Sequence, residues 1–144
     1  MFNELLITII SGVLVFAFSQ IVKDFFLTPI IKQRALIGQI SNALDFYANL
    51  YTNFPQDSEQ ESTDRQTMHV ELRNLGVELT SNSNLLPFYD LFVNIKLITQ
   101  KKKIFETKRE LIGLSNGSWP QNHDHIHNND QRAEKIKGLL NITL

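Results

Sequence analysis

The chain has 144 residues, 14 basic and 15 acidic side chains, a formal net charge of −1 and no cysteine. A nearly neutral chain of this length forms one small domain and has no overall attraction for nucleic acid. The absence of cysteine excludes disulfides and thiolate chemistry, and it fits a reducing compartment.

The first predicted element is the uncharged stretch 5–22, LLITIISGVLVFAFSQIV. At about 1.5 Å per residue, a helix of this length crosses the hydrocarbon part of a bilayer. Lys23, Lys32 and Arg34 follow the stretch and no basic residue precedes it, which keeps the C-terminal flank in the cytoplasm. We therefore expect residues 1–28 to be a transmembrane anchor with its N-terminus outside, and residues 29–144 to form a cytoplasmic helical domain.

Two other interpretations of this stretch stay open. A secretory signal peptide would be cleaved after Ala17-Phe18-Ser19, although such peptides begin with basic residues and Glu4 is the only charged residue here. A core helix of a soluble protein would need a larger apolar core than the polar remainder of the chain supplies.

Small and weakly polar side chains share one face of the predicted span, namely Thr8, Ser11, Gly12, Val15 and Ser19. Such a face allows two helices to approach closely in lipid, and its hydroxyls can bond between helices or to their own helix. We expect the span to associate with itself or with a membrane partner. No ionisable residue interrupts the stretch, which disfavours a transporter or pump.

The rest of the chain predicts an all-α fold, with a bundle of four to five helices behind the anchor. Apolar residues at helical spacing mark the stretches 30–53, 65–79, 87–99, 100–114 and about 130–140. Pro29 suits the first turn of the first of these helices, and Gly38 within it predicts close packing against a neighbour. The expected N-caps of the later helices are Ser62, Thr63 or Asp64, then Thr99, then Asn129 or Asp130.

Three irregular segments are expected between these helices. They are an acidic loop at 56–64, a turn at 80–84 and a His/Asn-rich loop at 116–129. The pair Asn116-Gly117 predicts a left-handed helix end.

One predicted helix is rich in basic residues, namely Lys101, Lys102, Lys103, Lys108 and Arg109. Such a cluster can contact anionic lipid or a nucleotide-like anion. Successive lysines on a helix point about 100° apart, so the other interpretation is a solvated helix face.

The alternating residues His123, His125 and His127 are of a metal-ligating type. Structural zinc sites draw ligands from two separated pairs, and the only other histidine is His69, so a solvated loop is the alternative. The chain contains no phosphate-binding glycine loop, no G-x-S-x-G and no H-E-x-x-H. We expect no cofactor and no enzymatic activity, and a metal-assisted enzyme is the hypothesis that would need these histidines.

Three segments together, RALIG at 34–38 leading into DFYAN at 45–49, LLPFYD at 85–90 and KRELIGLSN at 108–116, resemble a family of small uncharacterised bacterial proteins. In that family an N-terminal anchor precedes a cytoplasmic helical region. The resemblance implies bacterial origin and residence in the inner membrane, and it assigns no functional residue. The layout is also similar to that of membrane effectors of bacterial anti-phage signalling systems, in which a cyclic nucleotide or a protein triggers membrane disruption.

The sequence therefore predicts a membrane-anchored helical interaction module that forms a homo-oligomer or binds a partner membrane protein. The alternative is a membrane effector of an anti-phage system, triggered by an anionic, nucleotide-like messenger or by a partner protein.

Overall fold

The computed structural model describes residues 2–55 and 58–142. All regular structure in these ranges is helical, which confirms the predicted all-α fold class for them. The helices in chain order are α1 (Phe2–Val22), η1 (Lys23–Leu27), α2 (Thr28–Phe46), α3 (Ala48–Thr52), α4 (Glu59–Leu85), α5 (Tyr89–Asn94), α6 (Lys101–Asn116) and α7 (His123–Leu140).

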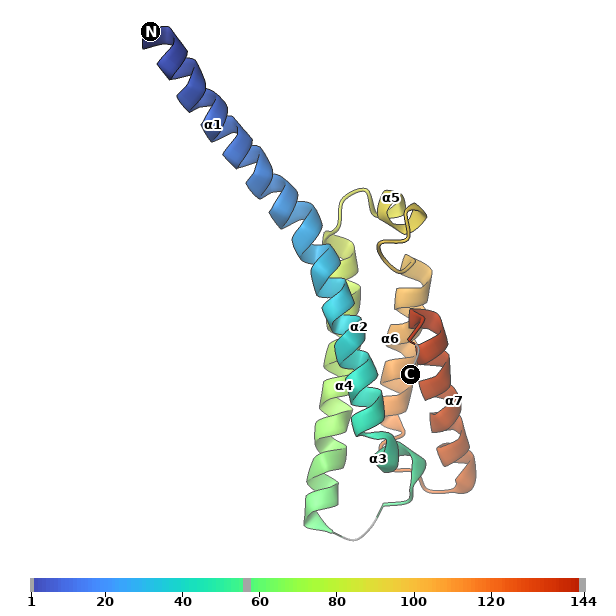
Figure 1. Cartoon of the computed structure of the whole chain (residues 1–144). Helices are drawn as coiled ribbons and strands as arrows, with labels where there is room; N and C mark the ends of the chain where they lie inside the picture. The colour runs from blue at the N-terminus through green and yellow to red at the C-terminus, as the bar shows by residue number, and fades with distance from the viewer. Residues whose placement is uncertain (1, 56–57, 143–144) are drawn as a thin grey trace.

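The N-terminal helix projects away from the rest of the molecule (Figure 1). α1 continues through η1, which is a π-helical turn, into α2. Across that turn, the Thr28 hydroxyl donates a hydrogen bond to the Lys23 carbonyl at 3.0 Å. Pro29 lies in the first turn of α2, as predicted, because a residue without an N–H is tolerated there.

Four long helices, α2, α4, α6 and α7, form the bundle, and consecutive ones run in opposite directions (Figure 1). α4 packs against both α2 and α6, α7 packs against α6, and the short α3 closes against α7. The predicted number of helices behind the anchor was four to five. In the described ranges, this region contains four long helices and two short ones, α3 and α5.

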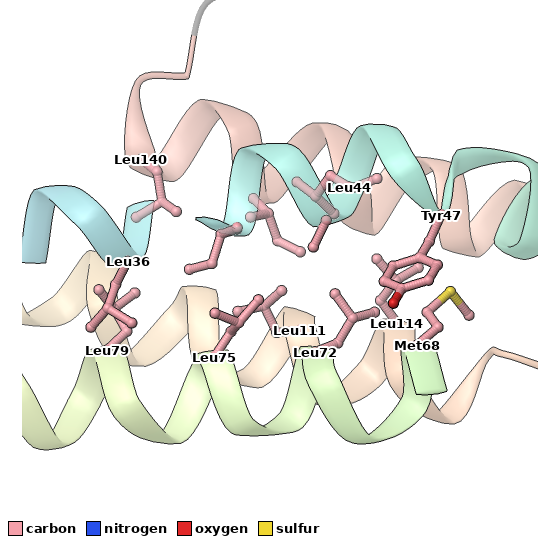
Figure 2. Packing of buried hydrophobic residues seen from close by; sticks show 14 of the residues in the cluster. Leu36, Leu44, Tyr47, Met68, Leu72, Leu75, Leu79, Leu111, Leu114 and Leu140 are labelled. Carbon is pink, nitrogen blue, oxygen red and sulfur yellow. The ribbon is translucent and has the colours of Figure 1, made fainter. Parts of the chain in front are cut away.

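The core lies where the apolar stripes of these helices meet. Leu36 of α2 lies beside Leu79 of α4 near one end, and Tyr47 lies beside Met68 and Leu114 near the other (Figure 2). These residues are buried and follow the helical spacing seen in the sequence. The core positions are therefore set by the same periodicity that predicts the helices.

α4 starts earlier than the predicted helix 65–79. Its N-cap is Ser58, whose hydroxyl accepts a hydrogen bond from the Glu61 N–H at 3.2 Å, and not Ser62, Thr63 or Asp64. The predicted acidic loop 56–64 is therefore wrong from residue 59 onward, while residues 56 and 57 lie outside the described ranges. Acidic side chains in the first turn suit the positive end of a helix.

α4 also ends later, so the predicted turn at 80–84 is wrong. The Thr80 hydroxyl donates to the Gly76 carbonyl at 2.9 Å, and the Ser83 hydroxyl donates to the Thr80 carbonyl at 2.7 Å. Asn82 donates to the Pro29 carbonyl of α2 at 2.8 Å. Three polar side chains of the predicted turn thus donate to helix carbonyls, while the buried Oδ1 of Asn82 has no hydrogen-bond partner.

The single helix predicted for 87–99 is wrong in extent, because only α5 is helical there. Phe88 and Lys96 flank α5 with left-handed backbone, at φ 51° and 59°. The N-cap of α6 is Gln100 and not the predicted Thr99.

The ends of α6 and α7 correct three further predictions. α6 ends at Asn116, but Gly117 has φ −82°, so the left-handed stop is wrong. α7 begins at His123, because Asn122 Oδ1 accepts from the His125 N–H at 2.9 Å. The loop predicted for 116–129 is therefore irregular only in its first part, and Asn129 and Asp130 lie inside α7 instead of capping it.

Close packing by glycine occurs at a different position from the one predicted. A Cβ at Gly38 would meet nothing within 4 Å, so this glycine packs against no neighbour. A Cβ at Gly76 would lie 3.4 Å from the Lys108 Cα, which shows how closely α4 and α6 approach.

One buried arginine joins α3, the first turns of α4 and the segment after α6. Arg65 is 1% exposed, and its Nη1 donates to the carbonyls of Leu50 and Ser118. Its Nη2 donates to the Asn53 carbonyl at 3.2 Å, and Nε and Nη2 donate to Glu61 Oε1 at 2.8 and 2.6 Å. The guanidinium therefore links α3, α4 and the segment after α6, a role that the sequence does not reveal.

Candidate functional site

The helix that leaves the bundle is the first candidate site. Leu6–Phe46 is one helix of 41 residues, and its most apolar window has a mean hydropathy of 2.0 with none of it buried. Within the described ranges 2–55 and 58–142, this is the one helix that is long and apolar enough to cross a membrane. The bundle does not cover α1, so the structure gives no support to a core helix of a soluble protein. A signal sequence has the same length and apolar composition, and that alternative stays open.

The predicted contact face lies on the exposed part of α1. All five of its members, Thr8, Ser11, Gly12, Val15 and Ser19, are exposed. A Cβ at Gly12 would meet nothing within 4 Å, so the chain itself leaves room for a close partner there. The Ser19 hydroxyl donates a hydrogen bond to the Val15 carbonyl at 2.7 Å. This hydroxyl therefore bonds to its own helix, which is the alternative to a bond between two helices.

A second, smaller apolar cluster lies where this helix enters the bundle. It joins Ile30 of α2 to Leu86, Tyr89 and Ile98, with Phe92 packed against it. The rings of Phe26 and Phe92 lie with their centroids 5.9 Å apart and their planes inclined by 53°. α5 is therefore held against the helix at the point where α1 leaves the bundle.

Polar contacts fix the same junction. The buried Gln33 amide donates from Nε2 to the Tyr89 hydroxyl at 3.1 Å, and its Oε1 accepts from the Thr99 N–H at 3.0 Å. The Tyr89 hydroxyl donates to the Thr99 carbonyl at 2.5 Å. Burial raises the pKa of Tyr89, an effect that the hydrogen bond from Gln33 opposes in part. Tyr89 therefore stays neutral and ties α5 to α2 and to the start of α6.

The predicted basic residues of α6 do not converge on one point. Lys101 Nζ lies 4.9 Å from the centroid of the Tyr89 ring, whereas Arg109 Nη2 lies 3.5 Å from Glu110 Oε1. Lys108 is half-buried against Gly76. Lys102 and Lys103 lie on the first turn of α6, so the predicted set of five spreads over the first nine residues of the 16-residue helix.

A different set of cations surrounds a groove of about 430 Å³ beside α5. Arg34, Lys96 and Lys103 line it together with polar groups, and none of its lining residues is acidic. Lys96 lies just before α6 and reinforces the predicted basic run, whereas Arg34 is absent from the predicted set because it lies far from α6 in the sequence. Such a groove has the charge and the hydrogen-bond donors to hold an anion.

A buried carboxylate joins α6 to α7. Glu110 accepts from Arg132 Nη1 at 2.7 Å and from Lys135 Nζ at 2.8 Å. Burial raises the pKa of Glu110, but Lys135, Arg132 and Arg109 lower it by more, so the pKa lies below its usual range. The carboxylate is thus ionised and neutralised by its neighbours, which makes it a structural contact between two helices.

The three predicted metal-ligating histidines lie in the first turns of α7 and are exposed. His123 packs edge-on against Phe54, with ring centroids 5.0 Å apart, and His127 Nε2 lies 2.9 Å from Gln131 Nε2. His125 Nδ1 accepts from the Gln121 N–H at 3.3 Å. Among the residues that the structure describes, no three His, Cys, Asp or Glu side chains are grouped to hold a metal ion.

Comparison with known proteins gave no match, since no family model, curated protein or solved structure is significantly similar to this chain. The resemblance to a family of small bacterial proteins therefore stays a prediction.

Proposed function

We propose that the protein is a membrane-anchored helical interaction module, in which α1 spans a bacterial inner membrane and the bundle lies in the cytoplasm. The observation that supports this most directly is the exposure of large apolar side chains along α1, including Phe16 at 65%. Removing one such side chain from water contributes about 1.5–3 kcal/mol. A bilayer provides that environment for all sides of the helix at once.

The proposed orientation follows from charge. Lys23, Lys32 and Arg34 lie on the bundle side of the apolar stretch, and no basic residue precedes it in the sequence. Basic residues beside a span stay in the cytoplasm, so the N-terminus is outside and the bundle is inside.

The interaction that we propose takes place within the bilayer. Lipid tails do not drive helices together, so association depends on close backbone approach and on hydroxyl contacts. The exposed face with Ser11, Gly12 and Val15 offers both. A second copy of this chain, or a partner's spanning helix, would pack on that face, and the bundles would then lie next to one another.

Cysteine crosslinking tests this proposal cleanly because the chain has no cysteine of its own. Ser11→Cys in native membranes should form a disulfide-linked dimer or an adduct to a partner on oxidation. Val13→Cys, on the opposite side of the helix, is the matched control and should crosslink far less.

The same assay shows whether the small residue matters. Adding Gly12→Ile to Ser11→Cys should abolish the crosslink, whereas adding Val13→Ile should leave it unchanged. The proposed association would be contradicted if Ser11→Cys gave only monomer on oxidation and Gly12→Ile had no effect.

A second candidate function has one specific observation in its favour, the groove with Arg34, Lys96 and Lys103 and no acidic lining residue. An effector that binds an anionic, nucleotide-like messenger there would perturb the membrane when triggered. Overexpression should then be toxic, and Lys103→Glu should relieve the toxicity while Lys137→Glu, in the last turn of α7, should not. Calorimetry on the full-length protein in detergent that detects no binding of cyclic dinucleotides would remove this candidate.

A further inference from the structure

We infer that the segment 85–97, which contains α5, lies in the surface of the same bilayer that α1 spans and contacts its lipids. In this inference, lipid and not another protein covers the exposed apolar side chains of the segment. The inference rests on the proposed function, because it takes α1 as the span, and it adds a second point of contact between the bundle and the membrane.

The first support is a concentration of exposed apolar side chains around the junction of α1 with the bundle. In a protein surrounded by water, a concentration of large apolar side chains is normally buried. We name this set the α5 apolar surface, and its exposed members are Phe25, Leu27, Ile31, Leu85, Phe88, Leu91, Ile95 and Leu97.

The second support is position. The Phe26 and Phe92 rings are in contact, and Gln33 bonds to both Tyr89 and Thr99, so α5 cannot move far from the start of α2. If the apolar helix crosses the bilayer up to about residue 28, the residues beside Phe26 are at the level of the lipid head groups. α5 lies at that end of the bundle in Figure 1.

The third support is charge complementarity with an anionic membrane surface. The residues 23–34 and 85–103 contain seven basic side chains and two acidic ones, Asp24 and Asp90, although the whole chain has 14 basic and 15 acidic residues. The end of the bundle next to α1 is thus positive, and the remaining residues together carry a net negative charge. Basic residues next to an apolar surface are typical of segments that lie in the interface of anionic bilayers.

The backbone at Phe88 gives a fourth observation. Phe88 has φ 51°, a conformation that a large aromatic residue rarely adopts, and its side chain is 74% exposed. The Phe88 carbonyl accepts a hydrogen bond from the Leu91 N–H at 3.0 Å, whereas the exposed ring gains nothing from this arrangement in water. Contact of the ring with lipid provides the stabilisation that the isolated bundle lacks.

Fluorescence quenching by brominated lipids tests the inference, because the chain has a single tryptophan. The background is full-length protein with Trp119→Phe, reconstituted into vesicles of phosphatidylcholine and phosphatidylglycerol with bromine on the acyl chains. Three variants each carry one new tryptophan: Phe16→Trp in α1, Phe88→Trp in the α5 apolar surface and Phe46→Trp at the far end of α2. Phe46 is the matched control, because it is 75% exposed and lies away from α5.

We expect Phe16→Trp and Phe88→Trp to lose most of their fluorescence, the latter with shallow bromines, and Phe46→Trp to keep it. Vesicles without phosphatidylglycerol should weaken the quenching of Phe88→Trp only. Leu91→Trp, in α5 itself, repeats the test should Phe88→Trp fail to fold.

The possible failures are distinguishable. Quenching of Phe16→Trp without quenching of Phe88→Trp or Leu91→Trp overturns this inference and leaves the span in place. No quenching of Phe16→Trp overturns the proposed function, and the inference with it. If Phe88→Trp is protected both from bromolipid and from aqueous acrylamide, a second copy of this chain covers the surface, which also overturns the inference.

Discussion

The ring of Phe26 in η1 packs against the ring of Phe92 in α5, with centroids 5.9 Å apart. These residues are far apart in the sequence, and their contact sets the position of α5 relative to the helix that leaves the bundle. A change in the angle between α1 and the bundle should therefore move α5 as well.

Phe92→Ala should loosen this junction without unfolding the bundle. Phe92 is half-buried and belongs to the small apolar cluster, so its truncation should cost about 1–2 kcal/mol locally. Hydrogen exchange should accelerate at the Leu97 N–H, which bonds to the Phe92 carbonyl at 2.9 Å, and stay unchanged in α7. Equal acceleration throughout the bundle would show that α5 is not a separate unit.

Arg65→Ala should destabilise the bundle strongly. The substitution removes the Arg65 hydrogen bonds to the Glu61 carboxylate and to the Leu50 and Ser118 carbonyls, at an expected cost of about 3–5 kcal/mol. Thermal unfolding by circular dichroism measures this loss. The matched control is Arg73→Ala on the same helix. Its exposed side chain bonds to Ser115 and Asn116, and these contacts should contribute less than about 1 kcal/mol. Equal losses for the two variants would contradict the role assigned to Arg65.

Glu110 should make the stability depend on pH in acid. Its pKa in the fold is lowered below 4.5, because the cations of Lys135, Arg132 and Arg109 outweigh its burial. A lowered pKa means that the contribution to stability is complete above pH 4.5, and it disappears as the pH falls below 4.5 through the lower pKa of the folded state. Unfolding curves across this range measure the effect.

The variant Glu110→Gln isolates that contribution. It should lower the stability by about 1 kcal/mol at pH 7 and flatten the acid dependence. Glu106→Gln, on the same helix, is the control and should keep the slope of the original protein. The same slope in Glu110→Gln as in the original protein would show that other carboxylates cause it.

Two glycines should respond oppositely to alanine. Gly38→Ala should stabilise the bundle by about 0.5–1 kcal/mol, because alanine favours a helix and nothing lies within 4 Å of the new methyl group. Gly117→Ala should destabilise it, since the methyl group would collide with the Asn129 amide. That amide donates to the carbonyls of Tyr51 and Gly117 at 3.0 and 2.8 Å. Stabilisation of both variants in chemical denaturation would contradict the position of Asn129.

The helical fold was predictable because apolar periodicity is a local property of the chain. Leu72, Leu75 and Leu79 indicate the buried face of α4 by spacing alone. The start of that helix was harder to predict, because Ser58, Ser62 and Thr63 are all residue types that cap helices, and the structure uses Ser58. Thr80 and Ser83 favour a turn by composition, yet they bond to helix carbonyls when the neighbouring helix covers them.

The candidate site was predictable in α1 and not in the bundle. An uncharged stretch can be recognised directly in the sequence. The groove, in contrast, brings together Arg34, Lys96 and Lys103 from three separate segments. The buried Arg65 shows the same limit, because an arginine near a predicted helix start is normally solvated. Contacts between distant segments need the packing of the helices to be known.

The orientation of the chain in the membrane is the most direct test of the account. Asn3→Cys and Gln66→Cys, made separately in the cysteine-free chain, can be labelled in intact cells with a membrane-impermeant maleimide. We predict that Asn3→Cys is labelled from outside and that Gln66→Cys is labelled only after the inner membrane is opened. Labelling of Gln66→Cys in intact cells, or a mature protein that has lost residue 3, would contradict a span with the bundle on the cytoplasmic side.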